Sequence, residues 1–373
     1  MKNSIRYGSD GAQATRFATG QRLRWVNPLS VMNVLFGAHT FVHPPETTGM
    51  SPAWEVLLPA HIDSAGPKSI SDFARCTGMD EYDSVDDALA DIGRYDAVIV
   101  RVTDLDAGVI DRADRLKVVA KHGAGLDNVD VGAASRRGIV VCNTPGANAR
   151  SVAEHALALL FGVRRHLRTA DRHVRSGGWD RSAFAGRELT GDTLGLFGFG
   201  AIARETADLA QGMGQAVCTY DPYLADADVP ARVDRVTDLP ALFQRADAVS
   251  IHAPLTPETR GAVSTDELTA LGPDGVLVNT ARGPIVDETA LLAALDAGRT
   301  GGAGLDTFAE EPPGEDHPFA ARDDVLLTPH VGGVTAEALE RMSRRAAANV
   351  RTVYEGALPD STVNRAALEE GER

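Results

Sequence analysis

The fold is decided by the stretch Thr193-Leu-Gly-Leu-Phe-Gly-Phe-Gly-Ala-Ile-Ala-Arg204. It reads as a short apolar strand, a glycine-rich turn and the first turn of a helix. Gly198 permits the tight turn, Gly200 lets the backbone approach a pyrophosphate, and the small Ala203 lets the helix lie close to the strand. The amino terminus of that helix offers N–H groups and a positive dipole end to phosphates. The pattern alone is also typical of a plain strand–helix turn, so its surroundings decide the interpretation.

The residues that follow favour NAD as the ligand. A second apolar strand, Ala216-Val-Cys-Thr-Tyr220, ends in Asp221, which stands roughly twenty residues past the glycines. A carboxylate at this position binds the ribose hydroxyls of the adenosine and repels the 2′-phosphate of NADP. The alternative is a simple turn residue before Pro222.

Length and charge narrow the class of protein. A chain of 373 residues is long enough for two hydrophobic cores. The net charge of −15 excludes a broad nucleic-acid or anionic-membrane surface, because phosphate binding needs basic patches. The three cysteines match no metal-ligand spacing and cannot all pair, which indicates a reducing compartment. We therefore expect a cytoplasmic protein with neither a bound metal nor a membrane-spanning segment.

Short apolar strands alternate with amphipathic helices along most of the chain. Residues 1–28 lack periodicity and are expected to form a poorly ordered extension. The alternative is an arm that packs on a partner subunit. A Pro-rich loop covers 43–52. The predicted strands cover 31–36, 97–100, 116–120, 138–142, 193–197, 216–220, 248–251, 275–278, 302–305 and 325–327, and the predicted helices cover 85–92, 107–113, 131–137, 149–176, 239–243, 265–271, 288–297 and 336–354. Such alternation predicts parallel sheets with right-handed crossovers.

Candidate catalytic side chains follow several of these strands, where a parallel sheet presents its ligands. Arg282, Glu311 and His330 lie on three successive loops. An arginine can clamp a carboxylate, and a histidine–glutamate pair can move the proton that accompanies a hydride. A fourth loop, Lys121-His-Gly-Ala-Gly-Leu-Asp-Asn128, is a glycine-rich turn that could hold a small anion. Each residue could also be an ordinary turn or capping residue. His155 and His252 lie in apolar surroundings and are interpreted as structural.

Several motifs in the same order carry a resemblance to a known family. Together they resemble the D-isomer-specific 2-hydroxyacid dehydrogenases, and within these the phosphoglycerate dehydrogenase branch. The motifs are Gly198-Phe-Gly-Ala-Ile-Ala203, Tyr220-Asp-Pro222, His252-Ala-Pro-Leu-Thr-Pro-Glu-Thr259, Asn279-Thr-Ala-Arg-Gly283, Leu305-Asp-Thr-Phe-Ala-Glu-Glu-Pro312, Leu327-Thr-Pro-His-Val-Gly-Gly333 and the connector Asn143-Thr-Pro-Gly-Ala-Asn-Ala-Arg-Ser-Val-Ala-Glu154. The resemblance covers about Val31 to Asn364.

The resemblance implies an α/β protein of two domains, each a doubly wound parallel sheet. A Rossmann-like NAD-binding domain at 145–330 would be inserted into a flavodoxin-like substrate-binding domain at 29–144 plus 331–358. Residues 359–373 would form a polar tail. The long helix 149–176 would connect the domains and serve as the candidate interface of a homodimer.

The resemblance also assigns roles to single residues. Arg282 would bind the substrate carboxylate, His330 would exchange the proton, and Glu311 would raise the pKa of His330. The backbone at Ala124 and Gly125 would meet the same carboxylate. The implied cofactor-binding residues are Gly198, Gly200, Ala201, Ile202, Asp221, Thr280, Ala281, Arg282, Asp306, His330, Gly332 and Gly333, with Asp306 on the nicotinamide carboxamide.

The chain departs from the phosphoglycerate enzymes near the substrate. The first arginine of a phosphate-binding pair is kept as Arg101, but Thr103 occupies the position of the second. We expect no C-terminal serine-sensing domains. Arg101 and Arg150 remain candidates for binding a second anionic group, such as a phosphate, a phosphonate or a distal carboxylate. The alternative is that both form surface ion pairs.

The expected function is an NAD-dependent oxidoreductase that interconverts a D-2-hydroxy acid and its 2-keto acid. Its partner would be a small anionic substrate, 3-phosphoglycerate-like or phosphonate-like if a second anionic group is bound. Two alternatives stay open: an NAD-sensing binding protein of the corepressor kind, and a phosphite-type dehydrogenase on the same fold.

Overall fold

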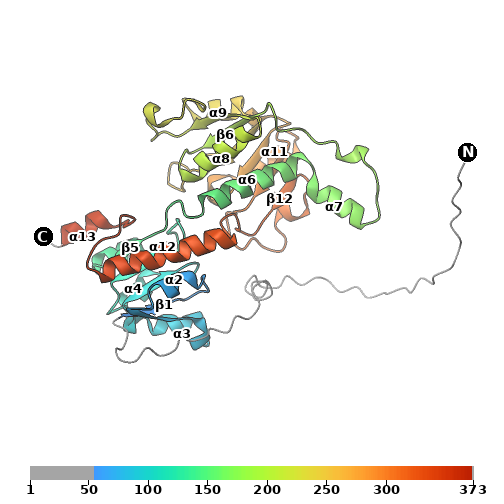
Figure 1. The fold of residues 1–373 in the computed structure, drawn as a ribbon. Helices are drawn as coiled ribbons and strands as arrows, with labels where there is room; N and C mark the ends of the chain where they lie inside the picture. Colours follow the sequence, from blue (N-terminus) through green and yellow to red (C-terminus); the bar gives the residue numbers. More distant parts are fainter. Residues whose placement is uncertain (1–53, 372–373) are drawn as a thin grey trace, which may run out of the picture. The chain divides into compact units, whose positions relative to one another are not determined.

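Two parallel β-sheets organise the computed structural model, which describes residues 54–371 (Figure 1). Every strand pairing within each sheet is parallel. This confirms the predicted α/β fold with two doubly wound sheets. The predicted extension 1–28, the strand 31–36 and the loop 43–52 lie outside the described residues.

The smaller sheet has the strand order β2-β1-β3-β4-β5. Its strands are β1 (Trp54–Leu57), β2 (Ala74–Thr77), β3 (Ala97–Val100), β4 (Val118–Lys121) and β5 (Val140–Cys142). This is the flavodoxin-like order, whose direction reverses between β1 and β3. Ligands bind beyond the carboxyl ends of the strands in such a sheet, and Arg101 immediately follows β3.

The larger sheet has the order β12-β11-β10-β9-β6-β7-β8. Its strands are β6 (Thr193–Phe197), β7 (Ala216–Tyr220), β8 (Asp234–Arg235), β9 (Ala248–Ile251), β10 (Val276–Asn279), β11 (Gly302–Leu305) and β12 (Val325–Leu327). This order contains the Rossmann arrangement and adds one strand at the β12 edge. The order reverses between β6 and β9, so the glycine-rich turn after β6 lies at the point where dinucleotides bind.

Helices flank both sheets, and many begin at an Asp, Ser or Thr whose side chain accepts a backbone N–H of the first turn. The α-helices are α2 (Ala65–Ser69), α3 (Val85–Ala90), α4 (Ala107–Asp111), α5 (Val131–Arg136), α6 (Ala149–Arg164), α7 (Leu167–Arg175), α8 (Ala201–Gly212), α9 (Leu239–Arg245), α10 (Thr265–Leu271), α11 (Glu288–Asp296), α12 (Ala336–Tyr354) and α13 (Arg365–Gly371). Short 3-10 helices are η1 (Met79–Glu81), η2 (Ile92–Arg94), η3 (Ser182–Phe184), η4 (Asp226–Asp228), η5 (Gly283–Ile285) and η6 (Pro318–Ala321).

Both sheets are buried on their two faces. Every residue of β3, β4, β9, β10 and β11 is buried, as expected for parallel strands covered by helices. Separate apolar clusters pack on either side of each sheet. Each fully buried Val, Leu or Ile contributes about 1.5–3 kcal/mol, so the loops at the strand ends extend from rigid supports. Among the helices that the structure describes, none combines the length and apolar character needed to cross a bilayer.

The prediction of one long helix over 149–176 is wrong. Helix α6 ends at Arg164, His166 adopts a left-handed conformation with φ 53°, and α7 starts one residue later. The buried Arg164 guanidinium donates to the carbonyl oxygens of Asp247 and Asp274, both at 2.8 Å. Helix α6 is therefore fastened to the larger sheet, while none of the residues of α7 is buried.

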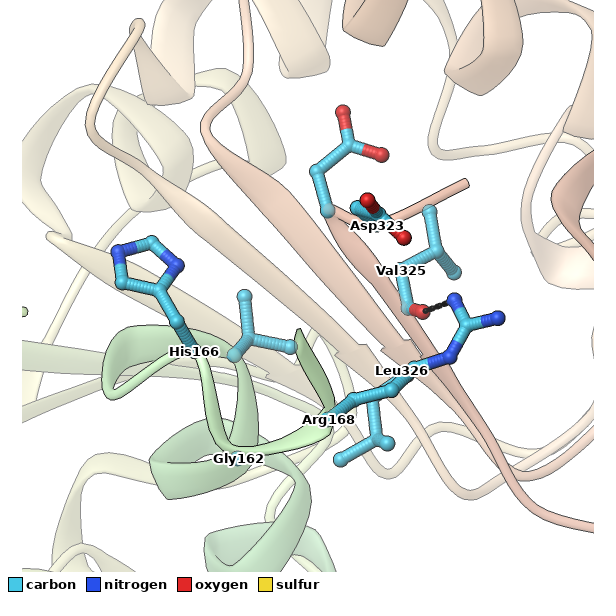
Figure 2. Close-up of a pocket in the computed structure, with 8 residues that line it drawn as sticks. Gly162, His166, Arg168, Asp323, Val325 and Leu326 are labelled. Carbon is cyan, nitrogen blue, oxygen red and sulfur yellow. Dashed lines mark hydrogen bonds between the residues drawn. The ribbon is translucent and has the colours of Figure 1, made fainter. Parts of the chain in front are cut away.

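A small pocket lies at this break, between the α6–α7 corner and the residues that lead into β12 (Figure 2). The Arg168 side chain crosses it and donates to the Val325 carbonyl oxygen at 3.2 Å and to the Ala320 carbonyl oxygen at 3.1 Å. Arg172 pairs with Asp323 at 2.6 Å. These contacts fix the direction in which α7 leaves the sheet, and none of the predicted catalytic residues lines the pocket.

The chain returns to the smaller sheet through α12, which packs on α2 and β4 (red in Figure 1). Two connections run between the sheets, and they touch each other. Ser151 and Thr335 share a hydrogen bond of 2.9 Å between their hydroxyls, and the Arg341 Nε donates to the Ala147 carbonyl oxygen at 2.9 Å. The larger sheet is thus inserted into the smaller unit; the exact domain boundaries stay a prediction.

The segment after α12 is more than the predicted polar tail. Thr362 forms an antiparallel bridge with Cys142 of β5, and α13 follows. The buried Asn364 accepts the Val141 N–H at 2.9 Å and donates to the Ile139 carbonyl oxygen at 2.9 Å. This segment therefore closes the exposed edge of the smaller sheet.

Candidate functional site

Three neighbouring strands of the larger sheet bring the predicted catalytic residues together. The parallel register places Asn279 of β10, Leu305 of β11 and Leu327 of β12 side by side. The loops that begin there carry Arg282, Asp306 with Glu311, and His330. Residues far apart in sequence therefore meet at one edge, as expected for the carboxyl ends of parallel strands.

His330 and Glu311 form the central pair. The His330 Nδ1 lies 2.8 Å from the Glu311 Oε2, and the other carboxylate oxygen of Glu311 accepts the Phe308 N–H at 3.0 Å. The hydrogen bond to Glu311 raises the pKa of His330 above its usual value, against the effect of partial burial. Burial works to raise the pKa of Glu311, but its bonds to His330 and Phe308 lower it overall. Since Nδ1 faces Glu311, Nε2 is the ring nitrogen that can meet a substrate.

Asp306 braces the turn on which His330 stands. Its side chain is 1% exposed, and one carboxylate oxygen accepts the Thr328 hydroxyl at 2.6 Å and the Val331 N–H at 2.9 Å. The other oxygen accepts the Gly332 N–H at 2.8 Å. His330 has φ 53°, which is unfavourable for a non-glycine residue and persists only where surrounding bonds enforce it. The predicted contact of Asp306 with nicotinamide stays a prediction.

His155 belongs to this brace. Its Nε2 lies 2.9 Å from the Thr328 hydroxyl and 3.3 Å from the Asp306 Oδ1. The apolar residues around His155 on α6 predict a structural histidine. The sequence does not predict its polar partners, Thr328 and Asp306, which lie on distant loops. Its spacing within α6 carries no signal of the Asp306 contact, because the two residues meet only in the folded sheet.

Arg282 makes a contact that the sequence does not predict. Its Nε and Nη2 donate to one oxygen of Asp127 at 2.9 Å and 2.8 Å, and its Nη1 donates to the Ala281 carbonyl oxygen at 2.7 Å. The charge of Arg282 acts on both Glu311 and His330. The residue after it, Gly283, packs so tightly that an added Cβ would lie 1.9 Å from the Phe308 carbonyl carbon. The Arg282 turn and the Glu311 loop are therefore in direct contact.

The glycine-rich turn after β6 has the shape needed for a dinucleotide. Gly198 has φ 88°, and a Cβ there would lie 2.8 Å from the Ala253 nitrogen, so only glycine fits. Gly200 directly precedes α8, and a Cβ on it would meet nothing within 4 Å, which leaves room for a phosphate. Asp221, at the end of β7, accepts the Phe199 N–H at 2.9 Å. It therefore also supports the glycine-rich turn after β6.

Two buried polar atoms near this turn and near Arg282 fit a bound cofactor. The Thr280 hydroxyl and the His252 Nε2 have no hydrogen-bond partner within residues 54–371. Burial lowers the pKa of His252 to about 3, so this ring is neutral. Unpaired buried polar groups are costly, and a dinucleotide placed between the two loops would supply partners. The residues present therefore fit NAD.

The remaining predicted cofactor residues have mixed surroundings. Ala201 and Ile202 form the first turn of α8, beside the open space at Gly200, and Ala281 donates its N–H to Asn279 at 3.0 Å. The two glycines after His330 pack on the chain itself. A Cβ at Gly332 would lie 3.0 Å from the Asp306 carboxylate, and one at Gly333 would lie 2.7 Å from Asn148. A larger residue at either position would displace one of these side chains.

Lys121 joins the loops that follow β3 and β4 of the smaller sheet. This lysine is 9% exposed, and its Nζ donates to the Arg101 carbonyl oxygen at 2.6 Å and to the Asn128 side chain. Asn128 donates onward to the Thr103 carbonyl oxygen at 2.6 Å. The loop after β3 and the glycine-rich turn after β4 are therefore fastened together. Burial lowers the pKa of Lys121 to about 8.

The two arginines predicted to bind a second anionic group have different surroundings. Arg101 is half-buried beside Lys121, and burial lowers its pKa. Arg150 pairs with Glu154 at 2.7 Å and with Glu205 at 3.3 Å on the surface. Of the predicted backbone contacts, the Ala124 carbonyl oxygen accepts Asn143 at 2.7 Å, and Gly125 lies against Arg282. Within residues 54–371, no group of three His, Cys, Asp or Glu side chains could hold a metal ion.

Comparison with known proteins agrees with this geometry. Residues 157–332 match the family model described as the D-isomer specific 2-hydroxyacid dehydrogenase, NAD binding domain. The chain is 42% identical over 280 residues to D-3-phosphoglycerate dehydrogenase of Mycobacterium tuberculosis, covering 75% of this chain and 53% of that protein. It thus spans about half the length of the phosphoglycerate dehydrogenases that it matches.

Shorter relatives are covered almost completely. Hydroxypyruvate reductase of Thermotoga maritima is 39% identical over 265 residues, which are 70% of this chain and 86% of the relative. The solved NADPH-dependent glyoxylate/hydroxypyruvate reductase of Sinorhizobium meliloti is 30% identical with a TM-score of 0.74, covering 84% of this chain and 98% of that one. A protein from Thermus thermophilus is 33% identical with a TM-score of 0.76, covering 83% and 99%. The chain therefore belongs to the D-isomer specific 2-hydroxyacid dehydrogenases and carries their NAD-binding domain.

Proposed function

We propose that this protein is an NAD-dependent oxidoreductase that interconverts a D-2-hydroxy acid and its 2-keto acid. The observation that carries the proposal is the 2.8 Å contact between His330 and Glu311, with the charge of Arg282 acting on both. Relatives named as phosphoglycerate dehydrogenase and as hydroxypyruvate reductase support the same reaction class.

Each side chain has a distinct task in this reaction. A cofactor held by the glycine-rich turn would supply the hydride for the keto carbon in reduction and would take it back in oxidation. Arg282 holds the substrate carboxylate and orients the keto group. His330 transfers a proton from Nε2 to the keto oxygen, which completes the alcohol together with the hydride. Glu311 stabilises the protonated imidazole before the transfer, and in oxidation His330 takes the proton back.

A steady-state screen tests the proposal. The purified protein is assayed with NADH against glyoxylate, pyruvate, hydroxypyruvate and phosphorylated 2-keto acids, with His330→Gln in parallel. We expect turnover by the wild type and retained NADH binding without turnover by the variant. NADH binding without turnover by the wild type would instead favour the NAD-sensing alternative, and NAD-dependent oxidation of phosphite would favour the phosphite-type enzyme.

We further propose that NAD is preferred over NADP. Asp221 follows β7 and holds the Phe199 N–H at 2.9 Å, so its carboxylate lies where the adenosine ribose would meet the glycine-rich turn. A 2′-phosphate would be repelled there. We expect kcat/KM to be higher with NADH than with NADPH. Asp221→Asn should reduce the ratio of kcat/KM with NADH to kcat/KM with NADPH. A wild type that prefers NADPH, as the Sinorhizobium relative is named, would contradict this proposal.

We propose that Arg101 binds a second anionic group of the substrate. Arg101 extends from the carboxyl end of β3, next to the loop that carries Gly125 and Asp127 through its Lys121 bond. Arg150 lies on the surface, on α6, and pairs with Glu154 and Glu205. Arg101→Ala should raise KM for a phosphorylated 2-keto acid far more than for glyoxylate, while Arg150→Ala should change both little. Equal effects of Arg101→Ala on both substrates would remove the proposal.

We propose a homodimer whose interface includes α7. Leu167, Val174 and Trp179 are 55%, 54% and 79% exposed, whereas α6 is largely buried on its own sheet. Exposed apolar side chains gathered in one segment indicate an interaction surface. Light scattering should give a dimer for the wild type, and Val174→Asp combined with Trp179→Asp should give a monomer. A monomeric wild type would contradict the proposal.

A cytoplasmic location is also proposed. Cys76, Cys142 and Cys218 are free thiols, and burial raises the pKa of Cys142 to about 12 and that of Cys218 to about 11. Thiols of this kind suit a reducing compartment. Cell fractionation tests this location.

A further inference from the structure

The Asp127–Arg282 contact joins loops from the two sheets. Asp127 follows the glycine-rich turn after β4, Arg282 follows β10, and the two residues are 155 positions apart. One carboxylate oxygen of Asp127 accepts both the Nε and the Nη2 of the arginine, at 2.9 Å and 2.8 Å. None of the roles given above uses Asp127.

The bonds around Arg282 select one edge of its guanidinium group. A guanidinium carries N–H groups on Nε, Nη1 and Nη2. Asp127 occupies the side edge formed by Nε and Nη2, and the Ala281 carbonyl oxygen takes one N–H of Nη1. By these bonds, Nη1 and Nη2 each keep one N–H without an acceptor among the described residues. The end-on edge that these two nitrogens form can bind a carboxylate with two parallel hydrogen bonds.

The backbone of the same turn is shaped around this arginine. A Cβ on Gly125 would lie 1.9 Å from the Arg282 Nη2 and 3.1 Å from the nearer Asp127 carboxylate oxygen. Any larger residue would push the guanidinium away from Asp127. The missing side chain at Gly125 and the Asp127 carboxylate therefore work together to hold Arg282 in one orientation.

We propose that Asp127 is a positioning residue for the reaction: it orients Arg282 so that the end-on edge of the guanidinium receives the substrate carboxylate. This inference rests on the proposed function. It assigns to the smaller sheet a part in substrate binding that acts through an arginine of the larger sheet. Asp127 itself does not touch the reacting atoms.

The competing view is that Asp127 blocks Arg282 by imitating a substrate carboxylate. The two views predict opposite results. If Asp127 orients the arginine, its removal weakens substrate binding, because the Arg282 guanidinium group loses its fixed orientation. If Asp127 blocks the arginine, its removal strengthens substrate binding.

The decisive experiment compares the wild type with Asp127→Asn and Asp127→Glu, with Asp104→Asn as the matched control. Asp104 is an exposed carboxylate whose charge acts on the neighbouring Lys121. For each protein we would measure kcat and KM for the preferred 2-keto acid, and the Kd of oxamate for the enzyme–NADH complex. NADH affinity and thermal melting report whether folding is intact.

For Asp127→Asn we expect KM and the oxamate Kd to rise about tenfold to a hundredfold, the usual effect of losing one charge-assisted hydrogen-bond partner. NADH affinity and melting temperature should be unchanged, Asp127→Glu should recover part of the loss, and Asp104→Asn should stay within about twofold. A purely structural role would lower the melting temperature along with activity.

A second readout is the pH profile of reduction. His330 faces Glu311, Asp306 and Arg282, and the positive charge of Arg282 lowers the pKa of His330. Without the Asp127 charge that offsets it, this effect becomes stronger, so the alkaline limb of kcat/KM should move to lower pH.

Three outcomes overturn the inference: a lower oxamate Kd in Asp127→Asn, wild-type values for that variant, or a loss that tracks its melting temperature. Absence of turnover in the wild type would instead count against the proposed function. The oxamate titration still reports on Arg282 in that case, because it needs no turnover.

Discussion

The two sheets fasten their functional loops with buried side chains of opposite charge. In the larger sheet the anionic Asp306 accepts backbone N–H groups of Val331 and Gly332 and so holds His330. In the smaller sheet the cationic Lys121 donates to the Arg101 carbonyl oxygen and to Asn128. Each brace suits the groups that it holds: a carboxylate accepts from N–H groups, and an ammonium group donates to oxygens.

The difference lies in how each brace responds to pH. Burial works to raise the pKa of Asp306, but the hydrogen bonds from His155, Thr328, Val331 and Gly332 lower it below its ordinary value. Asp306 therefore remains ionised throughout the neutral range. Lys121 has a pKa near 8, so its charge changes close to working conditions. The comparison teaches that the brace at His330 keeps its charge across the neutral range, while the charge of the Lys121 brace changes near pH 8.

The largest effect should come from substituting His330, which the Asp306 brace of the larger sheet holds. His330→Gln removes the proposed proton donor and should lower kcat about 10²–10⁴-fold, the usual contribution of a general acid. NADH binding, measured by fluorescence, should be retained. His166→Gln, at the α6–α7 corner, serves as the control. A variant of His330 with more than a tenth of the wild-type kcat would contradict this role.

The brace in the larger sheet should dominate stability. Asp306→Ala leaves the Val331 and Gly332 N–H groups without their acceptor, and we expect a loss of about 3 kcal/mol in the free energy of unfolding. Urea denaturation at neutral pH measures it, and Asp316→Ala, on the exposed part of the same loop, is the control. Because the pKa of Asp306 is lowered by folding, its contribution is present at neutral pH and disappears only as pH falls below about 4. Equal stability of both variants would show that the brace is weak.

The Lys121 brace in the smaller sheet should make the free energy of unfolding depend on pH. The pKa of Lys121 is about 8 in the folded protein and 10.5 ordinarily, so between these values the unfolded chain holds a proton that the folded one has lost. Stability must then rise with pH in this window. From pH 7.5 to 9.5 the wild type should gain about 1–2 kcal/mol relative to Lys121→Met. If urea denaturation shows no such gain of the wild type over Lys121→Met, the pKa of Lys121 in the folded protein lies outside this pH range.

The smallest expected effect concerns Glu311. Glu311→Gln removes the charge that raises the pKa of His330. In the proposed reaction, reduction uses protonated His330. We therefore expect kcat/KM to fall as pH rises through this pKa, and the fall should begin about one pH unit lower in the variant. Glu310→Gln is the matched control one residue away. A fall at unchanged pH in Glu311→Gln would mean that the alkaline limb belongs to another group.

Much of the fold follows from local patterns. Runs such as Ala97-Val-Ile-Val100 are fully buried, and the short length and β-branched residues of such a run, together with the turns around it, indicate a strand. Strands β1 and β2 escape prediction because Trp54–Leu57 and Ala74–Thr77 include charged or polar residues, which weaken the apolar signal. The break between α6 and α7 also escapes, since nothing at His166 marks a left-handed residue.

The residues of the candidate site also differ in how far the sequence predicts them. Arg282, Glu311 and His330 each follow a recognisable strand, so the parallel arrangement brings them to one edge. Asp127 and His155 are different, because their partners lie 155 and 151 positions away. Only the register of two separate sheets decides which of the many carboxylates meets an arginine. Long-range ion pairs of this kind cannot be obtained from the pattern of one sequence.

The touching connections between the sheets have a practical consequence. Since Ser151 and Thr335 share a hydrogen bond of 2.9 Å, the points where the chain enters and leaves the inserted unit are adjacent. A gene encoding residues from about that entry to that exit could be cut out as one cassette, and the remaining ends could be spliced with a very short linker. The same adjacency would let a cassette from a relative with different cofactor preference be grafted in its place.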